Sequence, residues 1–138
     1  MTTNSDLAAQ QALDRLAKSG FDALSPADRI LASVWTFESN VANRGLRQYF
    51  TSAAGDMAHF VPGALKTIGA VERADIANRA NAIFGVGGRP PDRARRRELA
   101  GSLSEEARDA LRDLEIQFYD SREDVDELLE TFLNKVQV

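Results

Sequence analysis

Apolar residues recur every three or four positions along most of this chain, and glycine or proline interrupts the pattern at short intervals. In residues 30–41, for example, Ile30, Leu31, Val34 and Val41 fall on one side of a helix. The strict alternation that is typical of a β-strand does not occur in the sequence. The pattern therefore predicts an all-α fold, a single compact domain over residues 1–138 with about seven or eight helices.

Local capping signals predict where these helices begin and end. Ser5 or Asp6 suits the N-terminal cap of a first helix that ends at Gly20, so residues 1–24 form an N-terminal helix and a linker. Ser25 and Pro26 suit the cap and the first position of the next helix. Further boundaries are expected at Gly45, Gly55, Pro62, Gly69, the loop 85–91, Asp92 and Ser104.

Composition excludes several kinds of protein. The chain has 138 residues and no cysteine, which excludes disulfides, thiolate catalysis and cysteine-bound zinc. The first residues lack the basic and apolar regions of a signal peptide, and no apolar run approaches the ~20 residues that cross a bilayer. We therefore expect a cytoplasmic protein with no membrane partner.

Charge is distributed unevenly along the sequence. Residues 104–134 carry eleven acidic side chains and three arginines, a net charge of −8, whereas residues 89–97 carry five arginines and one aspartate. If 104–134 forms two antiparallel helices, the acids make a dense negative surface. The arginines from Arg93 to Arg97 are expected to pair with these acidic helices, within the chain or across a dimer; binding of phosphate or RNA is the alternative.

The segment 38–56 combines polar amides, glycines and two adjacent aromatic residues, and it resembles the central motif of the bacterial DNA-mimic-protein family. The resemblance extends over residues 25–135. Arg44, Leu46 and Ser52 depart from the motif, where the family has a glycine, an aromatic residue and an asparagine. The matching residues are Glu38, Val41, Asn43, Gly45, Gln48, Tyr49, Phe50, Gly55 and Asp56.

The resemblance implies binding without catalysis, and we expect no cofactor and no metal. Members of the family imitate the charge distribution of DNA, form dimers and occupy the DNA-binding face of a regulator, so the implied partner is a DNA-binding or other basic protein and not nucleic acid itself. The residues expected to form the acidic partner-binding face are Glu105, Glu106, Asp109, Asp113, Glu123, Asp124 and Glu127. The simpler interpretation is that these acids are the solvated faces of two amphipathic helices, stabilising their N-terminal turns.

Two other functions stay open from the sequence. An immunity or inhibitor protein could bind its target through residues 38–56, and an enzyme could use Glu38, Asn43, Gln48 and Tyr49. We expect these motif residues to be structural instead, with Trp35, Tyr49 and Phe50 in or at the edge of the core. The one histidine, His59, lies too far along a helix from Ser52 for proton transfer and lacks a second histidine for a metal site.

Overall fold

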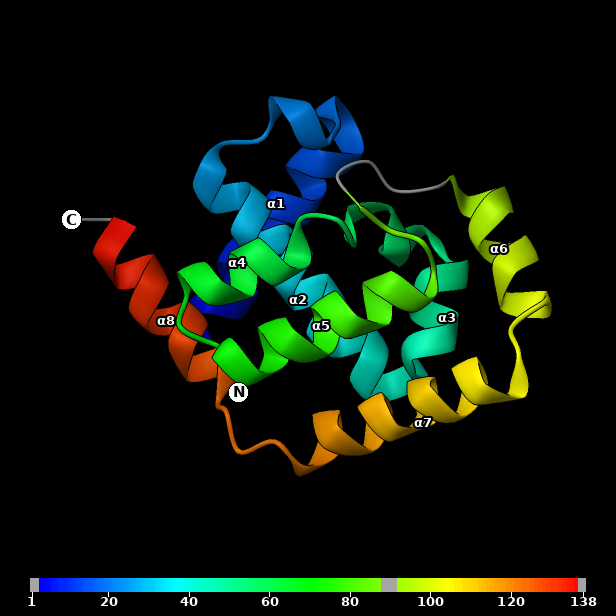
Figure 1. The fold of residues 1–138 in the computed structure, drawn as a ribbon. Helices are drawn as coiled ribbons and strands as arrows, with labels where there is room; N and C mark the ends of the chain where they lie inside the picture. Colours follow the sequence, from blue (N-terminus) through cyan, green and yellow to red (C-terminus); the bar gives the residue numbers. More distant parts are fainter. Residues whose placement is uncertain (1–2, 88–91, 137–138) are drawn as a thin grey trace.

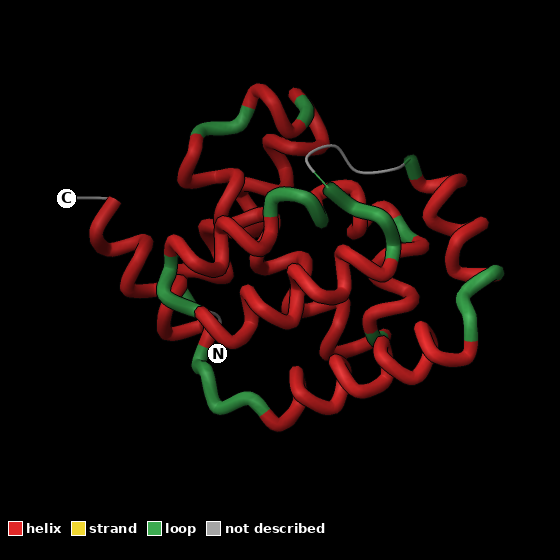
Figure 2. Tube along the Cα trace, in the orientation of Figure 1, coloured by secondary structure: helices red, strands yellow, loops and turns green. Residues whose placement is uncertain are grey.

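The computed structural model describes residues 3–87 and 92–136, which contain eight α-helices, two 3-10 helices and no strand. The prediction of an all-α single domain is confirmed. Short connections join the helices (Figure 2). Their order is α1 (Asn4–Ser19), η1 (Phe21–Ala23), α2 (Pro26–Arg44), α3 (Leu46–Thr51), η2 (Ala53–Met57), α4 (Val61–Thr67), α5 (Val71–Ile83), α6 (Arg93–Gly101), α7 (Glu105–Asp120) and α8 (Val125–Val136).

Helix α2 lies at the centre, with α1, α3, α4 and α8 packed around it (Figure 1). Its buried side includes Val34, Phe37 and Val41, which contact the core that Tyr49 and Phe50 extend. Trp35 is half-buried against the same core, so all three aromatic residues expected in or beside the core lie there. Burial of this apolar surface, at about 25 cal/mol per Å², is the main force holding α2 in place.

Most helix boundaries follow the predicted signals. The Ser25 hydroxyl accepts a hydrogen bond from the amide of Asp28, Pro26 is the first residue of α2, and Pro62 lies in the first turn of α4. The cap of α1 differs from the prediction, because Thr3 caps the helix and Asp6 completes a capping box. Of the predicted loop 85–91, residues 88–91 lie outside the described part of the chain.

The two C-terminal helices do not form the antiparallel pair considered from the sequence. Helix α7 packs against α5 and α3, whereas α8 packs against α1 and α2. The helices diverge from the connection at residues 121–124, with α7 running along one edge of the molecule and α8 turning away from it (Figure 1). The acids of residues 104–134 are therefore divided between two separate parts of the surface.

Candidate functional site

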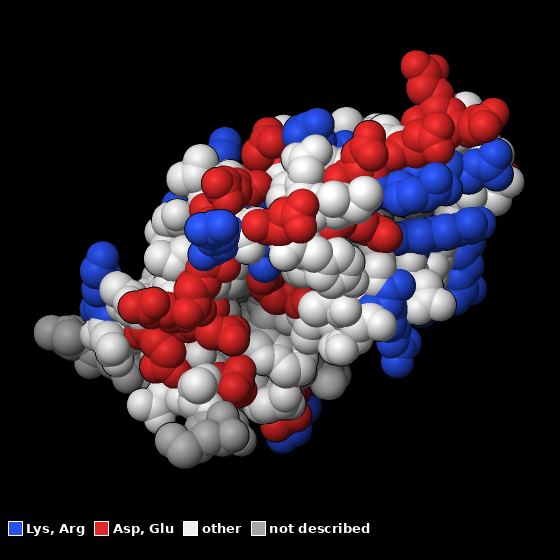
Figure 3. Space-filling model, turned by 90° about the horizontal axis from the view of Figure 1, so that it is seen from below, with Lys and Arg blue, Asp and Glu red and all other residues white. Residues whose placement is uncertain are grey.

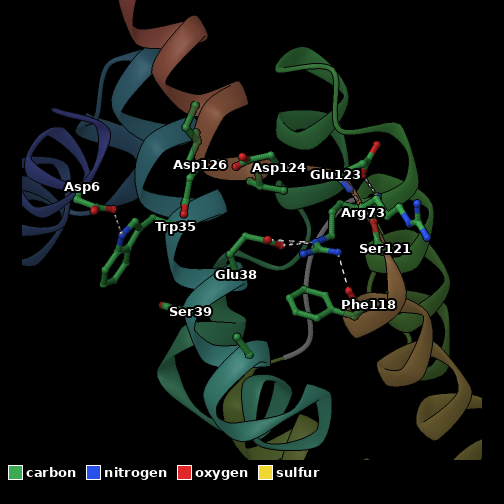
Figure 4. Close-up of a pocket in the computed structure, with 14 residues that line it drawn as sticks. Asp6, Trp35, Glu38, Ser39, Arg73, Phe118, Ser121, Glu123, Asp124 and Asp126 are labelled. Carbon is green, nitrogen blue, oxygen red and sulfur yellow. Dashed lines mark hydrogen bonds and ion pairs between the residues drawn. The ribbon is translucent and has the colours of Figure 1, made fainter. Parts of the chain in front are cut away.

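A hollow of about 530 Å³ opens between α2, the start of α5 and the connection from α7 to α8. The apolar part of its wall consists of Trp35, Phe118 and Leu129. The hollow is also lined by Arg73 and Arg122. Figure 4 shows how these side chains face the hollow from several helices. We call it the acidic groove, because five carboxylates line it: Asp6, Glu38, Glu123, Asp124 and Asp126.

A buried ion pair forms the inner end of the acidic groove. Arg73 Nε lies 2.9 Å from Glu38 Oε2, and Arg73 Nη1 donates a hydrogen bond to the Phe118 carbonyl at 2.7 Å. The guanidinium carbon also lies 3.9 Å from the centre of the Phe118 ring, within the range of a cation–π contact. Burial raises the pKa of Glu38 even though Arg73 opposes the shift, and nearby Asp126 and Glu123 raise it further.

Glu123 fixes the start of α5 from across the groove. No side chain within α5 caps its N-terminus. Instead, the Glu123 carboxylate accepts hydrogen bonds from the amides of Glu72 at 2.9 Å and Arg73 at 2.7 Å. A helix N-terminus leaves such amides unpaired and favours a negative charge beside them. Glu123, predicted as a partner-binding residue, is thus also a structural link between the α7–α8 connection and α5.

The outer rim of the groove brings three aspartates together. Asp6 accepts a hydrogen bond from Trp35 Nε1 at 3.2 Å, and Asp124 caps α8 by accepting from the amide of Glu127 at 3.0 Å. The pKa of Asp126 is raised by partial burial and by the neighbouring charges of Asp6 and Asp124. Negative potential is therefore concentrated here, in a position where a cationic group could reduce the repulsion.

The predicted acidic face is divided between this groove and α7. Glu123 and Asp124 line the groove, and Glu127 is exposed on α8. Seen from below, one cluster of acidic side chains lies over the start of α8, while the acids along α7 lie beside rows of basic side chains (Figure 3). The four predicted residues on α7, all exposed, are Glu105, Glu106, Asp109 and Asp113.

Gly45 ends α2 within the 38–56 motif, in a backbone conformation that other residues avoid. It has φ 87° and ψ 168°, and a Cβ built there would lie 2.8 Å from Glu115 Oε1. The same Glu115 oxygen accepts the amide of Leu46 at 2.8 Å. The Glu115 carboxylate on α7 thus satisfies the amide left unpaired at the start of α3.

Gly55 and Asp56 enclose a buried arginine from α6. Arg96 is 1% exposed and donates to the carbonyls of Phe50 at 2.7 Å and Ser52 at 3.0 Å and to Asp56 at 2.6 Å. A Cβ at Gly55 would lie 3.1 Å from Arg96 Nε and 2.8 Å from the Tyr49 carbonyl. Gly55 and Asp56 of the motif therefore help to hold α6 against α3 and η2.

The predicted pairing of the arginine cluster with the acidic C-terminal helices does not occur within the described part of the chain, and pairing across a dimer stays a prediction. Arg93 and Arg96 bind Asp56, and Arg97 donates to the Thr51 carbonyl at 3.1 Å. Arg95 forms an ion pair with Glu98 on its own helix. The cluster faces α3 and η2 because α6 packs there.

The structure does not bring together the residues of the alternative enzyme site. Glu38 lines the acidic groove, but Asn43 and Gln48 are exposed elsewhere, and Asn43 donates to the Ser39 carbonyl within α2. Tyr49 is fully buried, which raises its pKa, and its hydroxyl has no hydrogen-bond partner among the described residues. These side chains do not share a cavity.

His59 lines a hollow together with Asp22 and Asp56, and Ser52 does not line it. Ser52 donates to the Tyr49 carbonyl, and Asp56 is engaged by the two arginines. Burial lowers the pKa of His59, and its ring packs against Phe21. Within residues 3–87 and 92–136, no three acidic or histidine side chains are grouped to hold a metal ion, and no helix has the length and apolar character to cross a membrane.

Sequence reasoning missed the residues that shape the groove from outside the C-terminal helices. Arg73 shares a helical side with Ile76, Ala77 and Ala80, a spacing that places it on the buried side of α5. The position of Arg73 on the buried side of α5 was the signal available in the sequence, because a buried arginine needs a carboxylate partner. Nothing local indicated that Asp6 would join the rim.

The fold and the groove together describe a small all-helical protein with an acidic hollow on its surface. A model of the DMP19-like protein family matches residues 22–136, and the chain belongs to this family. The predicted resemblance is confirmed at this level, since DMP19-like proteins are a DNA mimic family and not a known enzyme family. Searches of curated proteins and of solved structures found no match.

Proposed function

We propose that this protein is a DNA mimic whose acidic groove binds the basic DNA-binding surface of another protein. The observation that carries the proposal is the excess of carboxylates in the groove, where five face two arginines. Arg73 is already paired with Glu38, so the rim keeps a negative potential that favours a cationic partner. Membership of the DMP19-like family supports the same function.

The fixed positions of these carboxylates also support binding. Asp124 and Glu123 hold helix N-termini, and Asp6 holds the Trp35 indole. A partner therefore meets charges whose geometry is already set, which lowers the entropy lost on association. Arginine or lysine side chains of the partner would replace repulsion between the aspartates with attraction.

Binding should depend on pH in a defined direction. Because the pKa values of Glu38 and Asp126 are raised, both groups take up protons at higher pH than ordinary carboxyl groups do. A cationic partner favours the ionised form, so affinity should fall as the pH drops through these raised values and protons should be released on binding.

Two variants with the same change in charge test whether the partner binds at the acidic groove or along α7. Asp124→Asn with Asp126→Lys alters the groove and keeps a capping side chain on α8, because asparagine also caps helices well. Asp109→Asn with Asp113→Lys alters the acidic side of α7. Proteins retained from the native cell extract by the wild type would be purified, and their dissociation constants measured for the wild type and for both variants.

We expect the groove variant to weaken binding by about tenfold or more, equivalent to ~1.4 kcal/mol, and the α7 variant to have little effect. Binding should weaken with added salt, and DNA carrying the partner's own site should compete. Loss of affinity in the α7 variant alone would overturn the groove as the site. Binding that is indifferent to salt and to competing DNA would overturn mimicry.

A further inference from the structure

Helix α7 carries acidic and basic side chains on different sides. Glu105, Asp109 and Asp113, each four residues apart, follow one line along the helix, and Arg108 and Arg112 follow another. Figure 3 shows rows of basic side chains beside the acids at the right of the view. The first half of α7 therefore has a basic side of its own, although the helix is acidic overall.

A hollow of about 170 Å³ lies between this basic side and α3. We call it the arginine groove, because three arginines line it with two leucines and one glutamate: Arg47, Arg108, Arg112, Leu103, Leu111 and Glu115. The glutamate already accepts the Leu46 amide, so it neutralises little of the positive charge. The volume is below the ~300 Å³ of usual small-molecule pockets and suits the ends of a few side chains.

The three arginines of this groove have few partners. Arg47 donates to the Ala100 carbonyl at 3.3 Å, and Arg112 Nη1 lies 3.5 Å from Asp109 Oδ1. The Arg108 guanidinium forms no hydrogen bond or ion pair with any residue of 3–87 and 92–136. The groove therefore keeps an excess of positive charge that an anionic group could neutralise.

The arginine groove and the acidic groove border the same side of α7. Tyr119 continues the line of Arg108 and Arg112, ~16 Å from the first and ~10 Å from the second at 1.5 Å per residue. Its hydroxyl donates to the carbonyls of Val41 and Ala42, and Ala42 lines the acidic groove. One bound protein could therefore contact both grooves across Tyr119, which is 59% exposed.

Carboxylate side chains of a protein fit the arginine groove better than a nucleic acid does. Guanidinium groups bind carboxylates and phosphates alike, through paired hydrogen bonds. A nucleic acid, however, carries negative charge along its whole length, so it would also meet the acids of α7 and those of the acidic groove. A protein surface can present its carboxylates at the arginine groove alone.

We infer that the arginine groove binds carboxylate side chains of the same partner whose basic surface occupies the acidic groove. The inference rests on the proposed function and adds a requirement to it. The partner has acidic side chains roughly 10–16 Å beyond the edge of its basic surface, the distances along α7 that separate the two arginines from Tyr119.

This contact selects one partner among DNA-binding proteins. The DNA backbone carries only negative charge, so a surface that binds DNA in general is basic across the whole contact. Its lysine and arginine side chains would be repelled at the arginine groove. A partner with carboxylates at that place gains attraction instead, and both effects favour it over other basic proteins.

Removal of two arginines tests the inference through the sign of the effect. The arginine variant, Arg108→Gln with Arg112→Gln, makes the protein more negative, so general electrostatic attraction would strengthen binding of any basic protein. We expect the reverse for the partner purified from the native cell extract, whose dissociation constant should rise about tenfold. An amidated decalysine peptide, which has no carboxylate, should bind the same variant more tightly than it binds the wild type.

A matched control removes two positive charges elsewhere. Lys18→Gln with Lys66→Gln changes exposed side chains that line neither groove, and it should not weaken binding of the partner. Both variants should keep the unfolding temperature of the wild type, because the changed side chains are exposed.

A second measurement needs no partner protein. Hexaglutamate would be titrated into isotope-labelled protein at low salt, and NMR would follow the side-chain Nε–H signals of Arg47, Arg108 and Arg112. We expect all three signals to shift with hexaglutamate and not with hexaglutamine. In the arginine variant the Arg47 signal should no longer respond. Inorganic phosphate should bind more weakly than hexaglutamate.

Several results would overturn the inference. Arginine signals that ignore hexaglutamate would do so, and tighter binding of inorganic phosphate would identify a phosphate site instead. Partner affinity that falls in the groove variant Asp124→Asn with Asp126→Lys, but not in the arginine variant, overturns this inference and leaves the proposed function standing. Affinity that falls in neither variant overturns both.

Discussion

Two buried arginines, Arg96 and Arg73, have different surroundings. Arg96 is buried and binds the carbonyls of Phe50 and Ser52 and the Asp56 carboxylate, which is half exposed. Arg73 binds the Phe118 carbonyl and the Glu38 carboxylate, whose pKa is raised mainly by burial and further by Asp126 and Glu123. The first arginine joins α6 to α3 and η2, whereas the second lies at the floor of a groove that keeps excess negative charge.

This difference separates structural charge from charge that is available to a partner. Buried ionic groups are tolerated where hydrogen bonds satisfy them, and the surroundings of Arg96 meet that condition within the chain. Around Arg73 the chain supplies more carboxylates than it neutralises. The contrast supports the proposal that the acidic groove is the binding surface and that the motif residues near Arg96 are structural.

The largest effect is expected from Arg96→Met. It removes the donor to the carbonyls of Phe50 and Ser52 and should lower the free energy of unfolding by about 3–5 kcal/mol. Urea unfolding at pH 5 and pH 7 would measure a similar loss at both values, because backbone carbonyls do not titrate. Arg95→Met, on the exposed side of α6, is the control and should change stability by no more than ~0.5 kcal/mol.

A smaller and pH-dependent effect is expected from Arg73→Met. At pH 7 it leaves the Glu38 carboxylate half-buried without its cation and should cost roughly 2–3 kcal/mol, less than a fully enclosed charge because the groove admits water. The pKa of Glu38, already raised, then rises further, so protonation restores part of the stability as the pH falls toward 5. An equal loss at both pH values would contradict the difference between the two arginines.

The smallest effect is expected from Asp126→Asn. In the wild type the folded-state pKa of Asp126 lies above its ordinary value, so the folded state binds more protons and stability falls as the pH rises through that window. Asparagine removes the repulsion with Asp6 and Asp124 and should stabilise the protein by up to ~0.5 kcal/mol at pH 7, with no gain in acid below the ordinary pKa. Unfolding curves between pH 3 and pH 7 would show a gain that grows with pH; a loss at pH 7 would contradict mutual repulsion.

The helices were predictable because their signals are local. Ser25 with Pro26, Gly45 and Pro62 each act within one turn of chain, and the apolar spacing of α2 identifies its buried side. The arrangement of α7 and α8 was not predictable in this way. Their apolar sides show that each packs against something, but the sequence does not say that α7 meets α5 while α8 meets α1.

The candidate site was predictable only in part for the same reason. Glu123 and Asp124 were identified from the density of acids near the C-terminus, but Asp6 reaches the groove from the other end of the chain. Arg96 was expected, with its neighbouring arginines, to pair with the acidic C-terminal helices. Its spacing from Ala100, which also faces inward, places it on the buried side of α6, but pairing with Asp56 depends on how α6 docks.

The hydrogen bonds to the Glu123 carboxylate make two backbone amides of α5 sensitive to movement of the wall of the acidic groove. Amides in the first turn of a helix ordinarily exchange their hydrogens with water quickly, because no carbonyl of a preceding helical turn accepts a hydrogen bond from them. Those of Glu72 and Arg73 are held by Glu123, so they exchange only when the α7–α8 connection moves away from α5. The exchange rates of two backbone hydrogens on α5 therefore record how often the wall of the groove opens, although neither residue belongs to the segment that moves.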